Sequence, residues 1–433
     1  MTPPVEQGSF VVEPAAVVSI PSPLELLLAR GRTRALLAML GPAFVAAIAY
    51  VDPGNFATNV QGGAQFGYLL LWVVLMANLM AMLVQYLSAK LGIVTDMNLP
   101  EVCRATYPRY VTWFLWLQAE GMAMATDVAE FVGAALGLNL LFGVPLLPAG
   151  FITGAISFLI LGLQRRGFRR FELAITALLG IIFAGFLYET LRISPPAASS
   201  LAGLVPHLAG SASILLAVGI IGATVMPHAI YLHSALTNGR VPPRNEGERR
   251  RILRFERLDV VVALGLAGVI NMAMLAVAAA LFHNPAGASI ATIEQAHQGF
   301  ARLVGGGAAL TFAVALLASG VSSSSVGTYA GQVVMAGFVN LRVPLPLRRA
   351  VTMTPALVLL ALSVSPTYAL VLSQVVLSFG IPFALVPLVL LTSNKTIMRE
   401  HVNSRLVSTT AWTIAGVIIV LNIYLLAAQF LGV

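Results

Sequence analysis

Long apolar stretches recur along nearly the whole chain and decide its environment. A helix needs roughly 20 apolar residues to cross about 30 Å of hydrocarbon, and runs of that length follow one another from residue 36 onward. Charged residues make up 10% of the chain, against roughly 25% in soluble domains. The sequence therefore predicts an all-α membrane protein with eleven transmembrane helices. The predicted helices cover residues 36–63, 68–93, 111–139, 146–164, 171–191, 211–236, 258–282, 308–338, 350–366, 368–392 and 409–430.

The N-terminal segment differs in composition from the rest. It is rich in Pro and lacks the basic stretch that opens a signal peptide. Residues 1–35 are therefore expected to form a disordered cytoplasmic tail. Residues 36–433 are expected to form a single transmembrane domain.

The distribution of Lys and Arg gives an independent check on this topology. These residues collect in the cytoplasmic loops of membrane proteins, and with eleven spans 23 of the 25 fall on one side, all except Arg192 and Arg302. The N-terminus is therefore expected to be cytoplasmic and the C-terminus external. This topology explains the net charge of +8 without nucleic-acid binding. The single cysteine, Cys103, excludes a disulfide framework and a cysteine metal cluster.

The first predicted helix contains a break. Its sequence is GPAFVAAIAYVDPGNFATNV, with Asp52, Pro53 and Gly54 at mid-span. Because proline has no N–H, Pro53 leaves the carbonyl of Ala49, four residues earlier, without its helical partner. Gly54 loosens the next turn. We therefore expect a free backbone oxygen near the membrane centre.

The sixth predicted helix has a comparable break. In LAVGIIGATVMPHAIYLHSAL, Pro227 frees the carbonyl of Ala223 in the same way. With five helices in each half, the two broken helices open two inverted repeats, over about residues 36–191 and 211–392, and residues 409–430 form an extra helix. Transporters of this architecture bind substrate and ions at discontinuous helices near the midplane. The alternative is that both prolines only kink packed helices.

Asp52 is difficult to explain by kinking alone. A charge at the bilayer centre costs at least about 2.5 kcal/mol unless it is paired or hydrated, which favours a cation site. Asn55 follows by three residues and Met226 directly precedes Pro227, so the breaks offer hard oxygens and one thioether. A thioether favours softer or borderline transition metals over Ca²⁺ and Mg²⁺. The alternative for Met226 is a flexible core residue.

Three acids of the third predicted helix are candidates for a proton pathway. Glu120, Asp127 and Glu130 fall within an arc of about 80° on one helical face. Intramembrane acids commonly mark proton routes. The alternative is that the three acids are buried as structural pairs with arginines.

The sixth helix adds two titratable groups, His228 and His233. His228 follows Met226 by two residues, about 200° round a helix, so it is expected to face away from the metal and to carry protons instead. Other polar residues inside apolar spans are expected to bridge helices rather than to touch substrate. These are Asn78, Gln85 and Asn271.

Two short motifs are specific in combination. DPGN in the first helix and MPH in the sixth, together with LASGVSSSSVGTYAGQ and LSQVVLSFGIPFALVPL further on, resemble the Nramp family of divalent metal transporters from about residue 36 onward. The resemblance implies a LeuT-like fold that imports Mn²⁺, Fe²⁺, Cd²⁺ or Co²⁺ with protons, by alternating access, across a bacterial cytoplasmic membrane. The implied partners are metal ions, protons and lipid, with no cofactor, no enzymatic activity and no obligatory protein partner.

The resemblance also implies roles for individual residues. The implied metal ligands are Asp52, Asn55, Met226 and the carbonyls of Ala49 and Ala223, with Gln374 in some states. The groups implied in proton movement, or in pairing of the third and ninth helices, are Asp52, His228, Asp127, Glu130 and Arg349. Arg348 is expected not to share this role, because adjacent residues do not share one helical face.

Three other functions are alternatives. A LeuT-fold amino-acid/cation symporter would bind a carboxylate at helix N-termini, where Asp52 would repel it unless a sodium ion intervened. An intramembrane metalloprotease would use His228 and His233, but HAIYLH lacks the glutamate of the HExxH motif. A channel is the third, although broken helices in inverted halves suit alternating access better.

Overall fold

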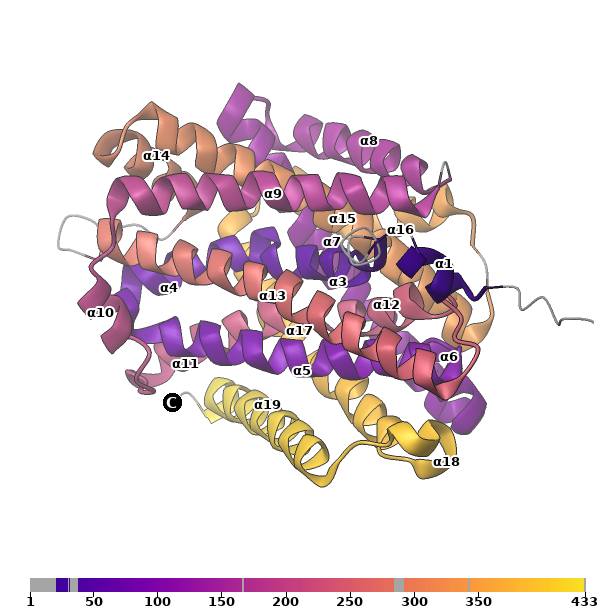
Figure 1. The fold of residues 1–433 in the computed structure, drawn as a ribbon. Helices are drawn as coiled ribbons and strands as arrows, with labels where there is room; N and C mark the ends of the chain where they lie inside the picture. Colours follow the sequence, from indigo (N-terminus) through magenta and orange to yellow (C-terminus); the bar gives the residue numbers. More distant parts are fainter. Residues whose placement is uncertain are drawn as a thin grey trace, which may run out of the picture.

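The computed structural model describes residues 21–29, 31, 38–165, 167–283, 292–341 and 343–431. Every regular element in these ranges is a helix (Figure 1), which confirms the all-α prediction for this part of the chain. The helices are α1 (Pro23–Ala29), α3 (Pro42–Ala47), η1 (Ile48–Val51), α4 (Pro53–Phe66), η2 (Gly67–Leu70), α5 (Leu71–Thr95), α6 (Leu99–Thr106), α7 (Arg109–Phe142), α8 (Leu146–Arg165), α9 (Phe168–Ile193), α10 (Ala197–Ala202), α11 (Gly210–Thr224), α12 (Pro227–Thr237), α13 (Glu246–Phe282), α14 (Ile293–Leu303), α15 (Gly306–Val339), α16 (Leu345–Ala361), α17 (Pro366–Thr392), α18 (Lys395–Met398), η3 (Arg399–His401) and α19 (Arg405–Leu431).

Nine helical segments in the described ranges are long and apolar enough to cross a membrane. Two of the eleven predicted spans are not among them as separate helices. The first is divided between a short apolar helix, Pro42–Val51, and a 43-residue segment, Pro53–Thr95, that also contains the second span. The ninth corresponds to α16, which has 17 residues. The break before Pro53 divides the first span, and the tight turn η2 joins α4 to α5 without a gap, so the second span is not a separate segment.

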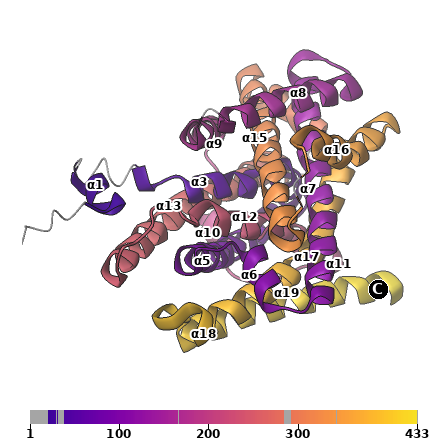
Figure 2. The ribbon, with the colours of Figure 1, turned by 90° about the vertical axis from the view of Figure 1, so that its right-hand side faces the viewer.

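The apolar helices divide into a buried core and a lipid-facing periphery. In the most apolar 18 residues of each segment, 89% of Gly210–Thr237 and 78% of α15 is buried, whereas only 28% of α19 is buried. α7 packs along α15 and α17, and α4 packs against α13 and α11. Figure 2 shows α19 at one edge of the bundle, where it contacts α17 and α11. The polar breaks therefore lie in the buried interior of the bundle.

The helical path is interrupted by extended residues at two places. η1 ends at Val51, Asp52 is extended with φ −79° and ψ 169°, and α4 begins at Pro53. α11 ends at Thr224 and α12 begins at Pro227, with Met226 extended between them at φ −76° and ψ 125°. A residue before proline avoids the helical region, while proline itself fits the first helical position. Each Xaa-Pro pair thus ends one helix and starts another.

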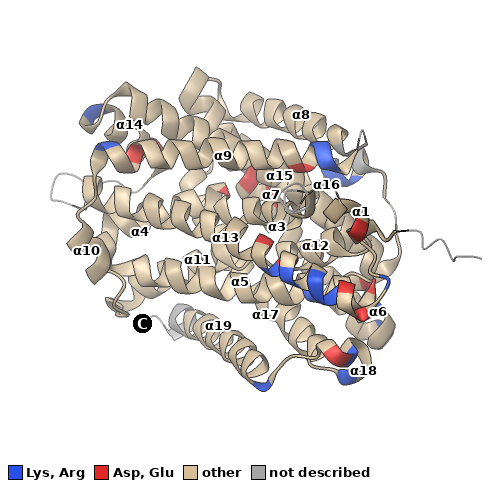
Figure 3. Cartoon of the chain, in the orientation of Figure 1, with Lys and Arg blue, Asp and Glu red and all other residues tan. Residues whose placement is uncertain are grey.

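The two ends of the bundle differ in charge. Figure 3 shows Lys and Arg gathered at the end where α1 lies, here called the α1 end. Among the described residues, Arg192 in the last turn of α9 and Arg302 in the last turn of α14 lie at the opposite end. The C-terminal end of α19 also points to that opposite end (Figure 1).

Part of the expected disordered tail is a docked helix. Ser22 and Glu25 exchange hydrogen bonds of 2.8 and 3.0 Å at the start of α1, and Leu24 is buried against Ile252 and Leu253 of α13. The remainder of the predicted tail, residues 1–20, 30 and 32–35, lies outside the described residues.

Candidate functional site

Asp52 occupies the gap between η1 and α4 and is fully buried. Its Oδ1 accepts hydrogen bonds from the backbone N–H of Asn55 at 2.8 Å and from Asn55 Nδ2 at 2.7 Å. The first of these caps α4, which places the carboxyl at the positive end of that helix. The one acid at the break is therefore enclosed by protein and held in a defined orientation.

Asn55 connects the two breaks. Its Nδ2 also donates to the carbonyl oxygen of Ala223 at 3.0 Å, and Thr224 Oγ1 lies 3.5 Å from its Oδ1. Pro227 cannot donate to that carbonyl within the helix, so Ala223 accepts from another element instead. Asp52, Asn55 and Ala223 are thus brought together across the gap between α4 and α11.

Gln374 of α17 reaches the same carboxyl, since its Nε2 donates to Asp52 Oδ2 at 3.3 Å. Two glycines allow this approach. A Cβ at Gly54 would overlap the Gln374 amide, and a Cβ at Gly222 would overlap the Gln374 carbonyl oxygen. Only the family resemblance predicted Gln374 as part of the site. The glycines beside both breaks also indicate that another helix packs closely there.

The other two ligand candidates lie in the same breaks. Ala49 belongs to η1 and Met226 is the N-terminal cap of α12, and both are fully buried. The nearby carbonyls of Tyr50 and Val51 accept hydrogen bonds from Asn271 Nδ2 at 2.7 Å and Ser319 Oγ at 2.6 Å. Side chains of α13 and α15 therefore fix the backbone that follows Ala49.

The expectation for the isolated polar residues is confirmed for Asn271 and Gln85. Asn271 bridges η1 and α4, because its Oδ1 also accepts from Asn59 Nδ2 at 3.0 Å. Gln85 bridges Tyr50 and His233. Asn78 lies closely against Gly268 of α13. The role of Ser319 was not predicted, and the serine-rich run that contains it was the available signal.

Two acids of α7 form ion pairs with α16. Arg349 Nη1 lies 2.8 Å from Asp127 Oδ1, and the guanidinium also donates to Ser324 and Thr328 and stacks 4.4 Å from the Phe131 ring centre. Arg348 binds Glu120 through two parallel hydrogen bonds of 3.0 and 2.7 Å. The structural alternative, pairing with arginine, therefore describes both acids.

The expectation that Arg348 and Arg349 cannot both face the third helix is wrong. They are the fourth and fifth residues of α16, and both reach α7. Glu120 and Asp127 are seven residues apart, about 10 Å along the helix axis. Two long side chains that diverge from adjacent positions can span that separation.

Glu130 differs from the other two acids. It is fully buried and has no arginine partner among the described ion pairs. Its carboxyl oxygens receive no well-formed hydrogen bond from the described residues, and Ser323 of α15 is the hydroxyl beside it. Asp52, Asp127 and Arg349 are close enough to act on its charge. A buried carboxyl without an ion-pair partner is costly and is a functional candidate.

His228 belongs to the first turn of α12 and contacts α7. Its Nδ1 is 3.2 Å from Thr126 Oγ1, and its Nε2 has no partner among the described residues. Thr126 directly precedes Asp127 on α7. His228 therefore contacts α7 one residue before Asp127.

His233 belongs to a separate buried chain of polar groups. Its Nδ1 is 2.9 Å from Gln85 Oε1, and its Nε2 is 2.9 Å from Glu256 Oε1 on α13. Gln85 in turn donates to the Tyr50 hydroxyl. Glu256 was not predicted as a buried residue. It lies in a charged stretch just before an apolar span, and such a stretch indicates a loop rather than a buried helix.

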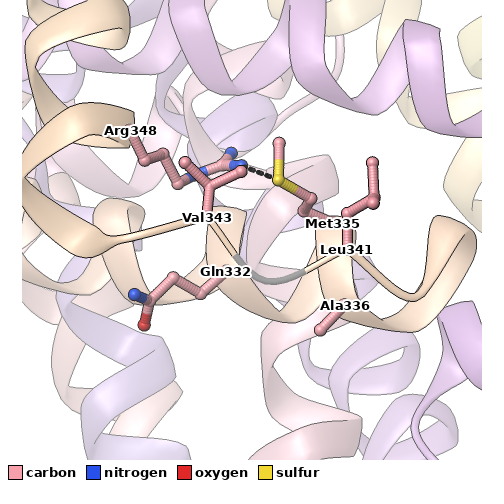
Figure 4. Close-up of a pocket in the computed structure, with 6 residues that line it drawn as sticks. All are labelled: Gln332, Met335, Ala336, Leu341, Val343 and Arg348. Carbon is pink, nitrogen blue, oxygen red and sulfur yellow. Dashed lines mark hydrogen bonds between the residues drawn. The ribbon is translucent and has the colours of Figure 1, made fainter.

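A cavity of about 260 Å³ lies beside the Arg348–Glu120 pair at the α1 end. Figure 4 shows the Arg348 guanidinium directed toward Met335 Sδ, at 3.6 Å. The cavity is lined by Gln332, Met335, Ala336, Leu341, Val343 and Arg348, none of which belongs to the breaks. It therefore gives space beside the Arg348–Glu120 pair and is distinct from the Asp52 site.

Comparison with known proteins covers almost the entire membrane domain. Residues 43–428 match the sequence profile of the family described as natural resistance-associated macrophage protein-like, Nramp. The divalent metal cation transporter MntH of Bacillus subtilis is 52% identical over 398 residues, which cover 92% of this chain and 93% of that protein. The protein of the same name from Deinococcus radiodurans is 53% identical over 393 residues, covering 91% and 90%.

Solved structures give the same grouping. A crystal structure of the Eremococcus coleocola manganese transporter has 34% identity and a TM-score of 0.83, covering 92% of this chain and 88% of that one. Mhp1, a nucleobase-cation-symport-1 family transporter in a closed conformation, has 14% identity and a TM-score of 0.58, covering 85% and 81%. At that identity the likeness to Mhp1 concerns the fold alone.

Proposed function

This chain belongs to the Nramp family, and from that premise we propose that it imports divalent transition-metal ions together with protons. The family consists of metal-ion transporters and not of enzymes. The proposed substrates are Mn²⁺ and Fe²⁺, with Cd²⁺ and Co²⁺ also accepted. The relatives named as manganese and divalent metal cation transporters support this choice. No cofactor and no protein partner are part of the proposal.

The observation that carries the proposal is the carboxyl of Asp52, fully buried at a helix break with the Asn55 and Gln374 side chains on its two oxygens. The ligands would be Asp52, Asn55, Met226, Gln374 and the carbonyls of Ala49 and Ala223. Oxygen ligands with one thioether suit Mn²⁺ and Fe²⁺ better than Ca²⁺. Asn55 now directs its amide hydrogens at the site, and it would turn its oxygen to an arriving cation.

The transport cycle we propose is alternating access in a LeuT-like fold. Two inverted five-helix repeats, about residues 36–191 and 211–392, would rock about the interrupted first and sixth helices, with residues 409–430 as an extra helix. The gathering of Lys and Arg at the α1 end supports a cytoplasmic N-terminus and an external C-terminus in a bacterial cytoplasmic membrane.

Uptake by liposomes tests the proposed function. Purified protein should carry Mn²⁺ or Cd²⁺ into liposomes, with internal acidification in step, while protein-free liposomes take up neither. Uptake of an amino acid in place of metal would favour the symporter alternative and contradict the proposal. Competition between Mn²⁺ and Fe²⁺ in the same assay would rank the substrates.

Met226→Ala tests the proposed selectivity. Loss of the thioether should preserve part of Mn²⁺ uptake and lower the preference for Mn²⁺ over Ca²⁺ by about tenfold, equivalent to about 1.4 kcal/mol. Met76→Ala is the matched control, because Met76 is 41% exposed on α5. Equal selectivity in both variants would remove Met226 from the site.

The proposed proton pathway joins Asp52 and His228 to Asp127, Glu130 and Glu120, with Arg349 paired to Asp127. His233 would form a second branch toward the α1 end. The burial of Glu130 without an arginine partner supports a role in proton transfer, because its protonation would break no ion pair.

Glu130→Gln tests this pathway, since glutamine keeps the shape of the side chain and cannot titrate. Metal-coupled acidification should fall by about 10- to 100-fold, while Mn²⁺ binding measured at equilibrium stays near wild type. Glu400→Gln is the control, because the Glu400 side chain is 63% exposed. If acidification is normal in both variants, α7 carries structural acids only.

A further inference from the structure

α17 contains two internal prolines, Pro382 and Pro387. Each lacks the N–H that would bind the carbonyl four residues earlier, so the helix itself cannot satisfy the carbonyls of Ser378 and Phe383. A buried backbone carbonyl without a donor is costly. The hydrogen-bond donors that replace the missing N–H groups therefore identify the helices that stabilise α17 at these two positions.

The donor at Ser378 comes from α19. Asn422 Nδ2 donates to the Ser378 carbonyl oxygen at 2.8 Å, and Ser378 Oγ is 2.7 Å from Asn422 Oδ1. The two residues thus form a reciprocal pair. Asn422 is 5% exposed on a helix that is otherwise largely open to lipid, and its neighbour Ile423 is 59% exposed. Packing alone does not explain a buried amide there, whereas the proline gap does.

The donor at Phe383 comes from a different helix. Tyr231 OH, on α12, lies 3.5 Å from the Phe383 carbonyl oxygen. This bond is longer than the 2.8 Å bond from Asn422. Its donor belongs to α12, the helix that follows the break at Pro227. The firmer of the two attachments is therefore the one to α19.

The Ser378 carbonyl is one helical turn from the proposed metal site. Ser378 follows Gln374 by four residues, so both side chains lie on one face of α17. That face packs on Gly222, which touches both the Gln374 carbonyl and the Ser378 side chain. Gln374 Nε2 in turn contacts Asp52 Oδ2 at 3.3 Å. A shift of α17 at Ser378 would move Gln374 relative to Asp52.

We propose that Asn422 is a positioning residue of the metal site, which acts through the Ser378 carbonyl freed by Pro382 to set the place of Gln374. The accessory helix α19, outside the two repeats, thereby tunes metal affinity. This inference rests on the proposed metal transport and adds a residue of α19 to the groups that control it.

Asn422→Ala tests the proposal in the liposome assay. The KM for Mn²⁺ should rise by about tenfold, as expected when a buried carbonyl loses its donor and its segment moves, with Vmax within about twofold of wild type. The equilibrium Kd for Mn²⁺ should rise in parallel. Ile423→Ala, a truncation one residue away on the lipid side, should leave both constants unchanged.

Two further backgrounds separate positioning from general packing. Pro382→Ala restores an N–H that can bind the Ser378 carbonyl, so adding Asn422→Ala there should change KM by less than about twofold. In a Gln374→Ala background, Asn422→Ala should also have little further effect, because the side chain it positions is absent. If Asn422→Ala fails to fold, recovery of folding and KM in the Pro382→Ala background supports the proposal, and no recovery contradicts it.

The outcomes distinguish this inference from the proposed function. A wild-type protein without metal uptake overturns the proposed function. Normal wild-type uptake with an unchanged KM in Asn422→Ala overturns the positioning role alone. The positioning role is also overturned if Asn422→Ala raises the KM by the same factor in the Pro382→Ala and Gln374→Ala backgrounds as in the wild type.

Discussion

Asp52→Asn is expected to abolish Mn²⁺ uptake, leaving liposomes with this variant no different from protein-free ones. Asparagine has nearly the same shape and can still accept a hydrogen bond from Asn55, so the change removes the charge and little else. A carboxylate attracts a divalent ion 4 Å away by about 8 kcal/mol at an effective dielectric constant of 20. Each 1.4 kcal/mol corresponds to about tenfold in affinity, so the loss should exceed that of any other single ligand.

Asp96→Asn is the matched control for this prediction. It makes the same chemical change at an exposed residue that ends α5 in the left-handed conformation, with φ 53°, which asparagine also tolerates. Uptake and folding should match wild type. Metal transport that survives in Asp52→Asn, with the control also active, would show that the break does not bind the cargo. Asp52→Ala should give the same loss of uptake as Asp52→Asn.

The largest expected loss of stability is for Arg349→Met. This arginine is fully buried and satisfies Asp127, Ser324 and Thr328 at once. Removing it leaves an unpaired carboxylate in the core, which costs about 3–5 kcal/mol. The measurement is the free energy of unfolding in detergent, followed by denaturant titration or as a fall in the melting temperature.

A double variant and a surface control complete that experiment. Asp127→Asn combined with Arg349→Met removes both charges, so most of the lost stability should return. Arg250→Met breaks a pair with Glu400 in which the side chains are 61% and 63% exposed, and it should cost no more than about 1 kcal/mol. Equal losses in Arg349→Met and Arg250→Met would mean that the buried pair is not a structural anchor.

Local chemistry made the breaks predictable. Proline without an N–H, next to an acid in an apolar span, pointed to Asp52, and the same reasoning at Pro227 pointed to the Ala223 carbonyl, which accepts from Asn55 in the structure. The apolar runs likewise predicted the membrane helices. Their separation was predicted less well, because the turn η2 joins α4 to α5 so closely that the two form one apolar segment.

Contacts between distant segments were not predictable in the same way. Arg348 and Glu120 are 228 residues apart, and only the way α16 lies against α7 decides that they meet. Glu256 pairs with His233 because α13 continues as a helix beyond the apolar span, whereas its local charges resemble a loop. Gln374 reaches Asp52 across two glycines. These contacts depend on how the helices pack against one another. The residues around each position in the sequence do not indicate which distant segment it will contact.

The side-chain amide of Asn55 matters for the metal-free state, in which the transporter would reset after releasing its ion. Its two hydrogens already bind Asp52 and the Ala223 carbonyl, at 2.7 and 3.0 Å. In the proposed cycle, this amide would take the place of the metal ion and would leave the empty carrier without an unbonded carboxylate in its core. An arriving ion must displace two hydrogen bonds, worth about 0.5–1.5 kcal/mol each. In the proposed site a divalent cation would be attracted strongly enough to replace these two hydrogen bonds, whereas a monovalent ion would gain about half as much from the same carboxylate. The two hydrogen bonds would then limit leakage of monovalent ions through the empty carrier.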